Sequence, residues 1–474
     1  MKIQNSTINS QRPAPNGVRR PVSFDVEYSM LNVKCSQRGS VLIIVLWVCI
    51  GLVAIALYFA NSMTYELRAS DNRASGMATD QAIEGAARYV STVLALYATN
   101  GTVPATNLYV AAAVPVGDAR FWLIGRNPSG APASGPCFGL VDEGSRLNLN
   151  TVNTNVLSYL PNMTTDFARA IVDWRSTNSS GAYALDYAQM GYQEKNAPFE
   201  TVDELRLVYG SSMALLVGDD LNLNGALDAN ETNSTGTSEL NSGLLDYATV
   251  YTREPNFHSD GSTLTNVNTA GERGLQALFE DAGVSSAAVR AAAIATRLRT
   301  APCNGLLDFC LRCENAGMGG DDFAKISDNV TTSTSAYIRG RVNVNTAGLD
   351  VLTALLMGVG LDQGTASGTA QSLITYRQQN PNNLNSIAWV LAALGNTSAA
   401  VRALARGDYV TTHSYQFTAD IAAVGPFGRG YRRVKFIFDT SDGTPKIIYR
   451  HDLSGLGWAL GETARETWVA RATQ

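Results

Sequence analysis

Residues 40–60 contain 21 consecutive residues without a charge, and this run limits what the chain can fold into more than any other feature. As an α-helix these residues would rise about 31 Å, which is close to the roughly 30 Å hydrocarbon core of a bilayer. Basic residues precede the run, namely Arg19, Arg20, Lys34 and Arg38, and positive residues stay on the cytoplasmic side of a membrane. The sequence therefore predicts one membrane-spanning helix, with the rest of the chain on the far side.

The helical pattern continues beyond the uncharged run, because apolar residues recur at intervals of three to four. They are Ile83, Ala86, Ala87, Val90, Val93, Leu94 and Tyr97. Such a pattern predicts a single long helix that is apolar all round at its start and amphipathic later.

Composition disfavours one class of function. The chain has 474 residues, which favours two or three folding units, and its formal net charge is −5. A polyanion-binding protein usually carries a basic patch or stripe, so this charge disfavours nucleic acid as a partner.

The first residues allow two translation starts. Residues 1–39 show little apolar periodicity, and Met30 lies ten positions before Ser40. A start at Met30 would leave a short basic leader, and both starts remain open.

Strand patterns flank a long central region. Two short apolar runs, Phe121–Ile124 and Cys137–Val141, are separated by turn-forming residues 127–130. Near the C-terminus, residues 415–424, 433–439 and 446–451 alternate apolar and polar positions. We expect one antiparallel sheet interrupted by an insertion at about residues 145–405.

The insertion contains an internal repeat, whose marker alternates asparagine with an apolar residue before threonine. It occurs at residues 147–151, 266–270 and 342–347. Asparagine and threonine at these places would cap the start of a helix, and helical runs follow each marker. The runs after the first and third markers are interpreted as two related helical subdomains at the ends of the insertion.

A twelve-residue stretch starting at Asp220 has the spacing of a calcium loop. The ligand positions are Asp220, Asn222, Asn224, the carbonyl of Ala226, Asp228 and Glu231, with Gly225 at the sharp bend. Short oxygen-bearing side chains alternate toward the ion, and Glu231 can chelate with both oxygens. The residues after Glu231 do not predict an exiting helix, so we expect a structural Ca²⁺ site rather than a paired regulatory EF-hand.

The junction before the membrane span carries a family resemblance. Gly39–Ser40 followed by an apolar helix, and then Glu66-Leu67-Arg68-Ala69, resembles the N-terminus of the type II secretion minor pseudopilin K family. Most pilins have glutamate at the fifth mature position, whereas this chain, like the K subunits, has an apolar residue there, Ile44. Asp142-Glu143-Gly144 and Ala197-Pro198-Phe199 also match that family.

The resemblance implies an α+β fold, in which a pilin-like long N-terminal helix and an antiparallel β-sheet are interrupted by a large all-α insertion of two SAM-like or helix-hairpin-helix-like subdomains. It also implies cleavage by prepilin peptidase between Gly39 and Ser40, calcium sites in the helical domain, and no catalytic role. The expected partners are the minor pseudopilins I and J, with H and the major pseudopilin G as further candidates. The implied location is the bacterial inner membrane, with a single pass and the C-terminal domain in the periplasm.

The expected function is that of a pseudopilus tip subunit that primes assembly for protein export across the outer membrane. The expected segments follow the chain in order. They are a cytoplasmic leader (1–39), a transmembrane helix (40–60), its amphipathic extension (61–98), the first sheet segment (99–144), the first helical subdomain with the calcium loop (145–235), the middle of the insertion (236–340), the second helical subdomain (341–405) and the C-terminal strands (406–474).

Cysteines and missing motifs complete the predictions. One disulfide is expected among Cys303, Cys310 and Cys313, while zinc would require Cys137 to join them from a distant strand, and free thiols are the third alternative. The chain has three histidines, no His-Glu-x-x-His pattern and no Gly-x-Ser-x-Gly elbow, so we do not expect an enzyme.

Two other functions remain open from the sequence. The repeats also resemble helix-hairpin-helix modules, which would suit a DNA-uptake or type IV pilus tip minor pilin. Arg377 is the one basic residue between Val342 and Gly395, which is little positive charge for phosphate binding. An unrelated single-span surface protein with calcium-stabilised repeats is the third hypothesis.

Overall fold

The computed structural model describes residues 40–98, 100–127, 135–177, 181–234, 236 and 240–468. The chain divides into two compact parts, residues 1–68 and 69–474. Of the first part the structure describes the start of helix α1 (Ser40–Tyr97), and the large apolar side chains of this start, from Val41 to Leu67, are exposed. Among the described residues α1 is the one helix that is long and apolar enough to span a membrane. The leader, including Gly39 and Cys35, lies outside the described residues.

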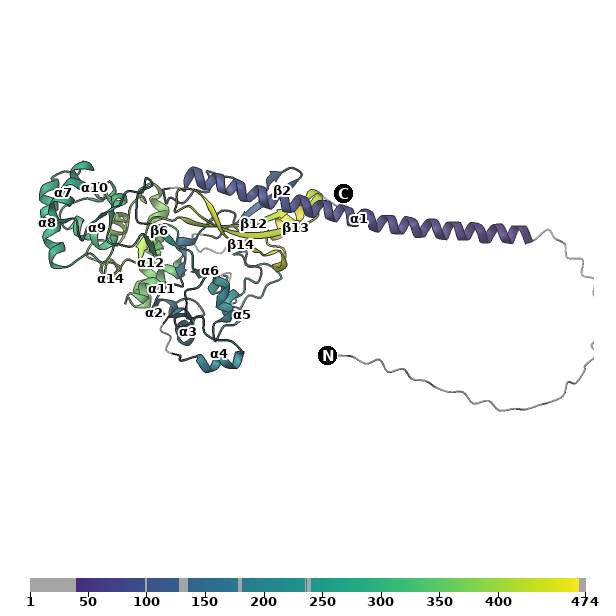
Figure 1. Cartoon of the computed structure of the whole chain (residues 1–474), viewed down its shortest axis with the longest axis horizontal. Helices are drawn as coiled ribbons and strands as arrows, with labels where there is room; N and C mark the ends of the chain where they lie inside the picture. Colours follow the sequence, from purple (N-terminus) through teal and green to yellow (C-terminus); the bar gives the residue numbers. More distant parts are fainter. Residues whose placement is uncertain are drawn as a thin grey trace, which may run out of the picture. The chain divides into compact units, whose positions relative to one another are not determined.

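The second part, residues 69–474, contains an antiparallel sheet (Figure 1). Its strands, in spatial order, are β1 (Val114–Val116), β2 (Ala119–Ile124), β12 (Gln416–Val424), β13 (Tyr431–Asp439) and β14 (Lys446–Asp452), and β3 (Val141–Asp142) also pairs with β12. The insertion therefore leaves the sheet after β3 and returns at β12, the strand to which β3 is hydrogen-bonded.

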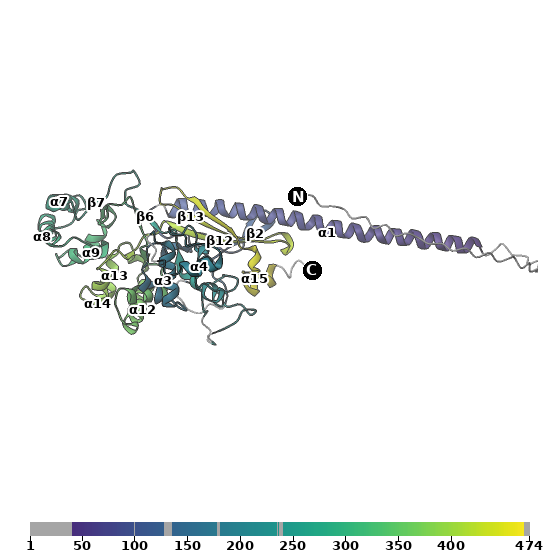
Figure 2. The same ribbon diagram turned by 60° about the horizontal axis from the view of Figure 1, so that its bottom comes forward.

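The two faces of the sheet pack against different segments, because successive strand residues point to opposite sides. Phe121, Leu123 and Ile421 face the later part of α1, where Ile83 and Val90 are buried in the same cluster. The neighbouring residues of these strands face the other way. They are Trp122, Ile124, Ala422 and Val424, which pack against Ala459 and Leu460 ahead of α15 (Gly461–Trp468) (Figure 2).

Three parallel two-residue bridges close three helical units in the insertion. β4 (Leu147–Asn148) pairs with β5 (Ala248–Thr249), β7 (Thr265–Asn266) pairs with β8 (Val330–Thr331), and β10 (Val342–Asn343) pairs with β11 (Val410–Thr411). We name the enclosed segments the first unit (147–249), the middle unit (265–331) and the last unit (342–411). Each unit begins at one of the three asparagine markers.

Helices fill each unit. The first contains α2 (Thr154–Ser158), α3 (Thr165–Arg175), α4 (Ala184–Met190), the 3₁₀-helix η2 (Val202–Leu207), α5 (Met213–Val217) and α6 (Leu244–Tyr247). The middle contains α7 (Gly271–Asp281), α8 (Ala287–Thr300), α9 (Leu306–Glu314) and α10 (Gly320–Ala324). The last contains α11 (Leu349–Gly358), α12 (Gln363–Gln379), α13 (Ala388–Leu394) and α14 (Ala399–Leu404). An antiparallel pair, β6 (Arg253–Pro255) with β9 (Tyr337–Arg339), leads into and out of the middle unit.

The marker asparagines explain why the same closure recurs. In each unit the first asparagine accepts from the amide two residues on, as in Asn148 with Asn150, Asn266 with Asn268 and Asn343 with Asn345. The second asparagine then reaches across the unit to distant backbone groups. The markers thus act as internal connectors rather than as helix caps.

The structure confirms the predicted α+β fold class, with one long helix and an antiparallel sheet. The insertion is mainly helical rather than all-α, because it also contains short paired strands. The three C-terminal strands lie within two residues of their predicted bounds. The run Cys137–Val141 forms less strand than expected, with β3 starting at Val141 and an isolated bridge at Phe138, while the predicted turn falls partly outside the described residues. The middle marker, which the sequence analysis did not group with the two related ends, opens a third unit with the same kind of parallel bridge as the outer two.

Candidate metal centre

The predicted metal loop follows α5 in the first unit. Gly218, at φ +66°, turns the chain out of α5, and its bridge to Ser242 closes the base of the loop. Asp220, Asn222 and Asn224 are all buried, although they are polar. Burial of polar side chains is costly unless hydrogen bonds or a bound ion compensate, so their partners decide what the loop can do.

The first half of the loop is organised around the carboxylate of Asp220. Its two oxygens accept from the backbone amides of Asn224, at 2.9 Å, and Gly225, at 2.7 Å. Gly225 has φ +77°, and a Cβ there would lie 2.8 Å from Cδ of Arg126, so glycine is needed for both conformation and space.

The second half of the loop brings Asp228 and Glu231 back to the first half. The carboxylate of Glu231 accepts from the amides of Asn222, at 3.2 Å, and Asp228, at 2.9 Å. Oδ2 of Asp228 accepts from Nδ2 of Asn222, at 2.6 Å, and Nδ2 of Asn224, at 3.0 Å. The structure therefore brings Asp220, Asn222, Asn224, Asp228 and Glu231 together in one closed loop.

One orphaned atom tests whether this loop suits a cation. Oδ1 of Asn222 is buried and has no hydrogen-bond partner among the described residues. Rotating this amide would place Oδ1 where Nδ2 lies now, beside Oδ2 of Asp228. Two oxygens that close repel each other unless a cation lies between them, and the hard ion Ca²⁺ prefers such oxygen donors. The side-chain oxygens of the loop are therefore of the kind that Ca²⁺ prefers.

Carboxylates alone do not make the site. No group of three or more His, Cys, Asp or Glu side chains in the described part of the chain could hold a metal ion. The fit thus depends on the amide oxygens of Asn222 and Asn224 and on a backbone carbonyl, for which Ala226 has the expected position in the loop.

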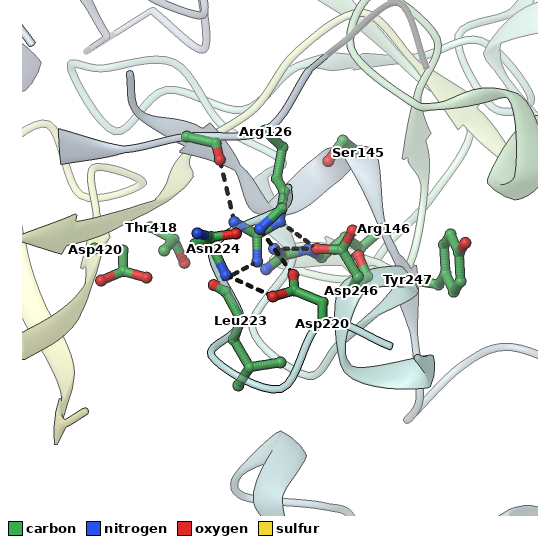
Figure 3. Close-up of polar contacts among 12 residues, drawn as sticks. Arg126, Ser145, Arg146, Asp220, Leu223, Asn224, Asp246, Tyr247, Thr418 and Asp420 are labelled. Carbon is green, nitrogen blue, oxygen red and sulfur yellow. Dashed lines mark hydrogen bonds and ion pairs between the residues drawn. The ribbon is translucent and has the colours of Figure 1, made fainter. Parts of the chain in front are cut away.

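Two arginines, Arg126 and Arg433, donate to backbone carbonyls of the loop, and Figure 3 shows Arg126 beside Leu223 and Asp246. Arg126, just after β2, donates to Asp246, at 2.5 Å, and to the carbonyl of Leu223, at 3.1 Å. Burial raises the pKa of Asp220 to about 6, and the nearby charge of Arg126 opposes this rise. Arg433 on β13 donates to the carbonyls of Asn222 and Leu223 as well. Sequence reasoning missed both arginines, because their contacts join positions about a hundred residues or more apart.

The other predicted site residues lie elsewhere. Ser40 is the first residue of α1, and Ile44 is exposed on that helix. Cys303, Cys310 and Cys313 are buried as free thiols in the middle unit, and Cys137 is half-buried. Burial raises the pKa of Cys303 to about 12 and that of Cys313 well above its usual range. The disulfide stays a prediction.

Comparison with known proteins gave a likeness in structure but none in sequence. No family model matches the chain, and no curated protein matches it. A chain in the crystal structure of the GspK-GspI-GspJ complex from the type 2 secretion system of enterotoxigenic Escherichia coli is similar over 79% of this chain and 96% of its own, with a TM-score of 0.39 and 10% sequence identity.

Proposed function

We propose that this chain is a minor pseudopilin of a type II secretion system, of the K type. The observation that carries the proposal is helix α1, which combines an exposed apolar start with a later part packed on an antiparallel sheet. A subunit built in this way can be anchored in a bilayer by the start of the helix and held in a fibre by the same segment once it leaves the lipid. The Gly39–Ser40 junction and the apolar Ile44 support the same proposal.

The insertion supports a place at the fibre tip. Three helical units follow β3 and precede β12, so the head is far larger than a sheet and one helix require. In a helical fibre each head stacks on its neighbours, and a bulky head fits best where no subunit lies above it. Ile44 agrees, because a glutamate in the membrane costs about 2.5 to 3.5 kcal/mol and is useful only where it neutralises a neighbouring subunit's N-terminal amine.

The proposed partners are the minor pseudopilins I and J, with which the chain would prime assembly in the inner membrane. The proposed role is positioning and recognition, not bond chemistry. Site-specific cross-linking from cysteines introduced along the exposed part of α1, with Cys49 replaced by serine, tests this proposal. Cross-links to I and J are expected, and an assembled fibre with subunits both above and below this chain would contradict the tip position.

We also propose that the loop from Asp220 to Glu231 holds a structural calcium ion. Asp220, Asn222, Asn224, the Ala226 carbonyl, Asp228 and Glu231 would hold it, and the ion would supply the positive charge that lets their oxygens converge. Affinity is expected around 10⁻⁴ to 10⁻³ M, as in extracellular modules. Calorimetric titration of the full chain in detergent tests this, with Asp220→Asn and Glu231→Gln expected to abolish binding. The exposed Asp260→Asn is the control, and equal binding by all the variants would refute the site.

DNA binding is a second candidate with less support. Arg377, the one cation between Val342 and Gly395, is buried and donates to the carbonyls of Val344, at 2.9 Å, and Ala347, at 2.8 Å. This guanidinium is used to stabilise the last unit, and because it is buried it does not present its charge to a DNA phosphate. Fluorescence anisotropy with labelled duplex DNA at low salt tests the candidate, and tight binding would favour a DNA-uptake pilin.

A further inference from the structure

The candidate metal loop contacts the sheet through its backbone carbonyls. The carbonyl of Asn222, a ligand position, accepts from Nη1 of Arg433, and the next carbonyl, of Leu223, accepts from Nη2 of Arg433 at 2.7 Å. Leu223 has φ +56°, a left-handed conformation that aims these successive carbonyls. The direction of both carbonyls therefore depends on how the loop is folded.

Arg433 is held rigidly on the sheet side of this contact. Its side chain is fully buried on β13, and its Nε and Nη2 donate to the two carboxylate oxygens of Asp420 on β12, at 2.9 and 2.6 Å. A guanidinium fixed by such a two-point contact presents its remaining N–H groups in one orientation. It can bind the loop only when the loop carbonyls are correctly placed.

Arg126 makes a second contact of the same kind. Its Nη2 donates to the carbonyl of Leu223, its Nε binds Asp246 of α6, and its aliphatic stem lies against Gly225 (Figure 3). A cavity of about 210 Å³, lined in part by Arg126, Leu223 and Asp420, lies beside these contacts. Hydrogen bonds from the two arginines, more than close apolar packing, thus hold the loop at this point.

We propose that Arg433 and Arg126 couple calcium binding in the loop to attachment of the first unit to the sheet. An ion held by Asp220, Asn222 and Asn224 would fix the peptide planes between them, and those planes carry the carbonyls that the arginines bind. Coupling between two binding events is reciprocal, so attachment to the sheet raises calcium affinity, and calcium strengthens the attachment. This inference rests on the proposed calcium site.

Lysine substitutions test the coupling without touching a calcium ligand. Arg433→Lys and Arg126→Lys keep the positive charge but lose the fork that binds a carboxylate and a carbonyl at once. We expect each to weaken calcium binding about tenfold in calorimetric titration of the full chain in detergent, because couplings of 5- to 150-fold are typical. Arg377→Lys is the matched control, since Arg377 is also buried and donates to two carbonyls, but in the last unit. It should bind calcium as the wild type does.

Hydrogen exchange provides a second readout and separates two kinds of failure. With calcium, amides of β13 and of residues 125–127 should exchange more slowly than with a chelator, in addition to those of the loop. Calcium binding by the wild type with protection confined to residues 219–231, or with unchanged affinity in both lysine variants, would overturn the coupling and leave the site standing. No calcium binding by the wild type would overturn the site itself. Should Arg433→Lys fail to fold, Arg126→Lys decides, because Arg126 is partly exposed.

Discussion

At the scale of single residues, two adjacent acids, Asp142 and Glu143, connect the sheet to the insertion. Asp142 accepts from Asn343 and Thr346 of the last unit, and Glu143 accepts from Arg146 and from Thr249 at the end of the first unit. Glu143 also accepts from Thr418 on β12. Both acids are almost completely buried, so these connections exclude water and fix where the insertion leaves the sheet.

Asp142 should make stability depend on pH. Burial raises its pKa to about 6, although hydrogen bonds from Ser414, Thr346, Gly144 and Asn343 lower it, whereas an unfolded chain has about 3.9. The folded chain therefore binds this proton more tightly. The resulting stability is fully present below about pH 4 and is lost as the pH rises through about 6.

Urea unfolding of the wild type and of Asp142→Asn between pH 4 and 7 measures this effect. The stability advantage of the wild type over the variant should shrink as the pH rises, by at most about 3 kcal/mol for a shift of two pKa units. An advantage that stays constant or grows with pH would contradict the assignment.

The cysteines should differ in reactivity, because the thiolate is the reactive form. Burial raises the pKa of Cys303 to about 12 and holds the pKa values of Cys310 and Cys313 above the ordinary range, whereas Cys137 is half-buried. Iodoacetamide at pH 8 should modify Cys137 well before the other three in the native protein. Mass spectrometry after denaturation, with and without reductant, would then show whether two of the three form the predicted disulfide. Rapid native labelling of all three would contradict their burial.

At the scale of elements, the second marker asparagine fastens each helical unit. Asn150 accepts from the amide of Phe199, at 2.7 Å, and donates to its carbonyl, at 2.9 Å. Asn268 makes the same pair of bonds with Cys303, at 2.7 and 3.1 Å. In each of these two units, one amide side chain therefore joins two distant chain segments. This link adds to the parallel bridge that closes the unit.

Replacing these asparagines by alanine should destabilise the head. Asn150→Ala and Asn268→Ala each leave a backbone N–H and C=O without their partners, which costs about 2 kcal/mol. Urea denaturation monitored by tryptophan fluorescence checks this, and the exposed Asn304→Ala should stay within about 0.5 kcal/mol of the wild type. A loss as small as that of the control would show that water replaces the missing bonds.

Most strands of the sheet and part of the insertion could be predicted from the sequence. Residues 416–424, 431–439 and 446–452 alternate apolar and polar positions, and this period of two predicts strands, although β12 is buried throughout and β14 is mostly exposed. The two-residue bridges are too short to show any period, and the closing threonines Thr249, Thr331 and Thr411 match only once the pairing is known. Helices were expected after the second marker, and Leu275 and Phe279 follow it at helical spacing, but the likeness of the middle unit to the outer two depends on its bridge.

The candidate metal loop could be proposed from the sequence, but its contacts with Arg433 and Arg126 could not. Its ligand positions lie within twelve residues, so their spacing is visible in the sequence. Arg433 contacts Asn222 across 211 positions, and Arg126 contacts Leu223 across 97. No local pattern records such contacts, because they exist only after the sheet and the first unit have folded.

At the scale of the whole molecule, the chain combines a helix that has an exposed apolar start with a head made of the sheet and the helical insertion. The sheet is built from residues on both sides of the insertion, and the three helical units share one hydrophobic cluster. In the proposed subunit, the exposed start of α1 packs with lipid or with other helices. This division suits a subunit that moves from a membrane into a fibre.

The central claim, that this is a prepilin-type subunit, is tested most directly by the N-terminus of the processed protein. Sequencing it from cells with and without prepilin peptidase should give Ser40 as the first residue in the first case and an uncleaved leader in the second. Any other first residue in peptidase-positive cells, or Ser40 in cells without the peptidase, would contradict the account.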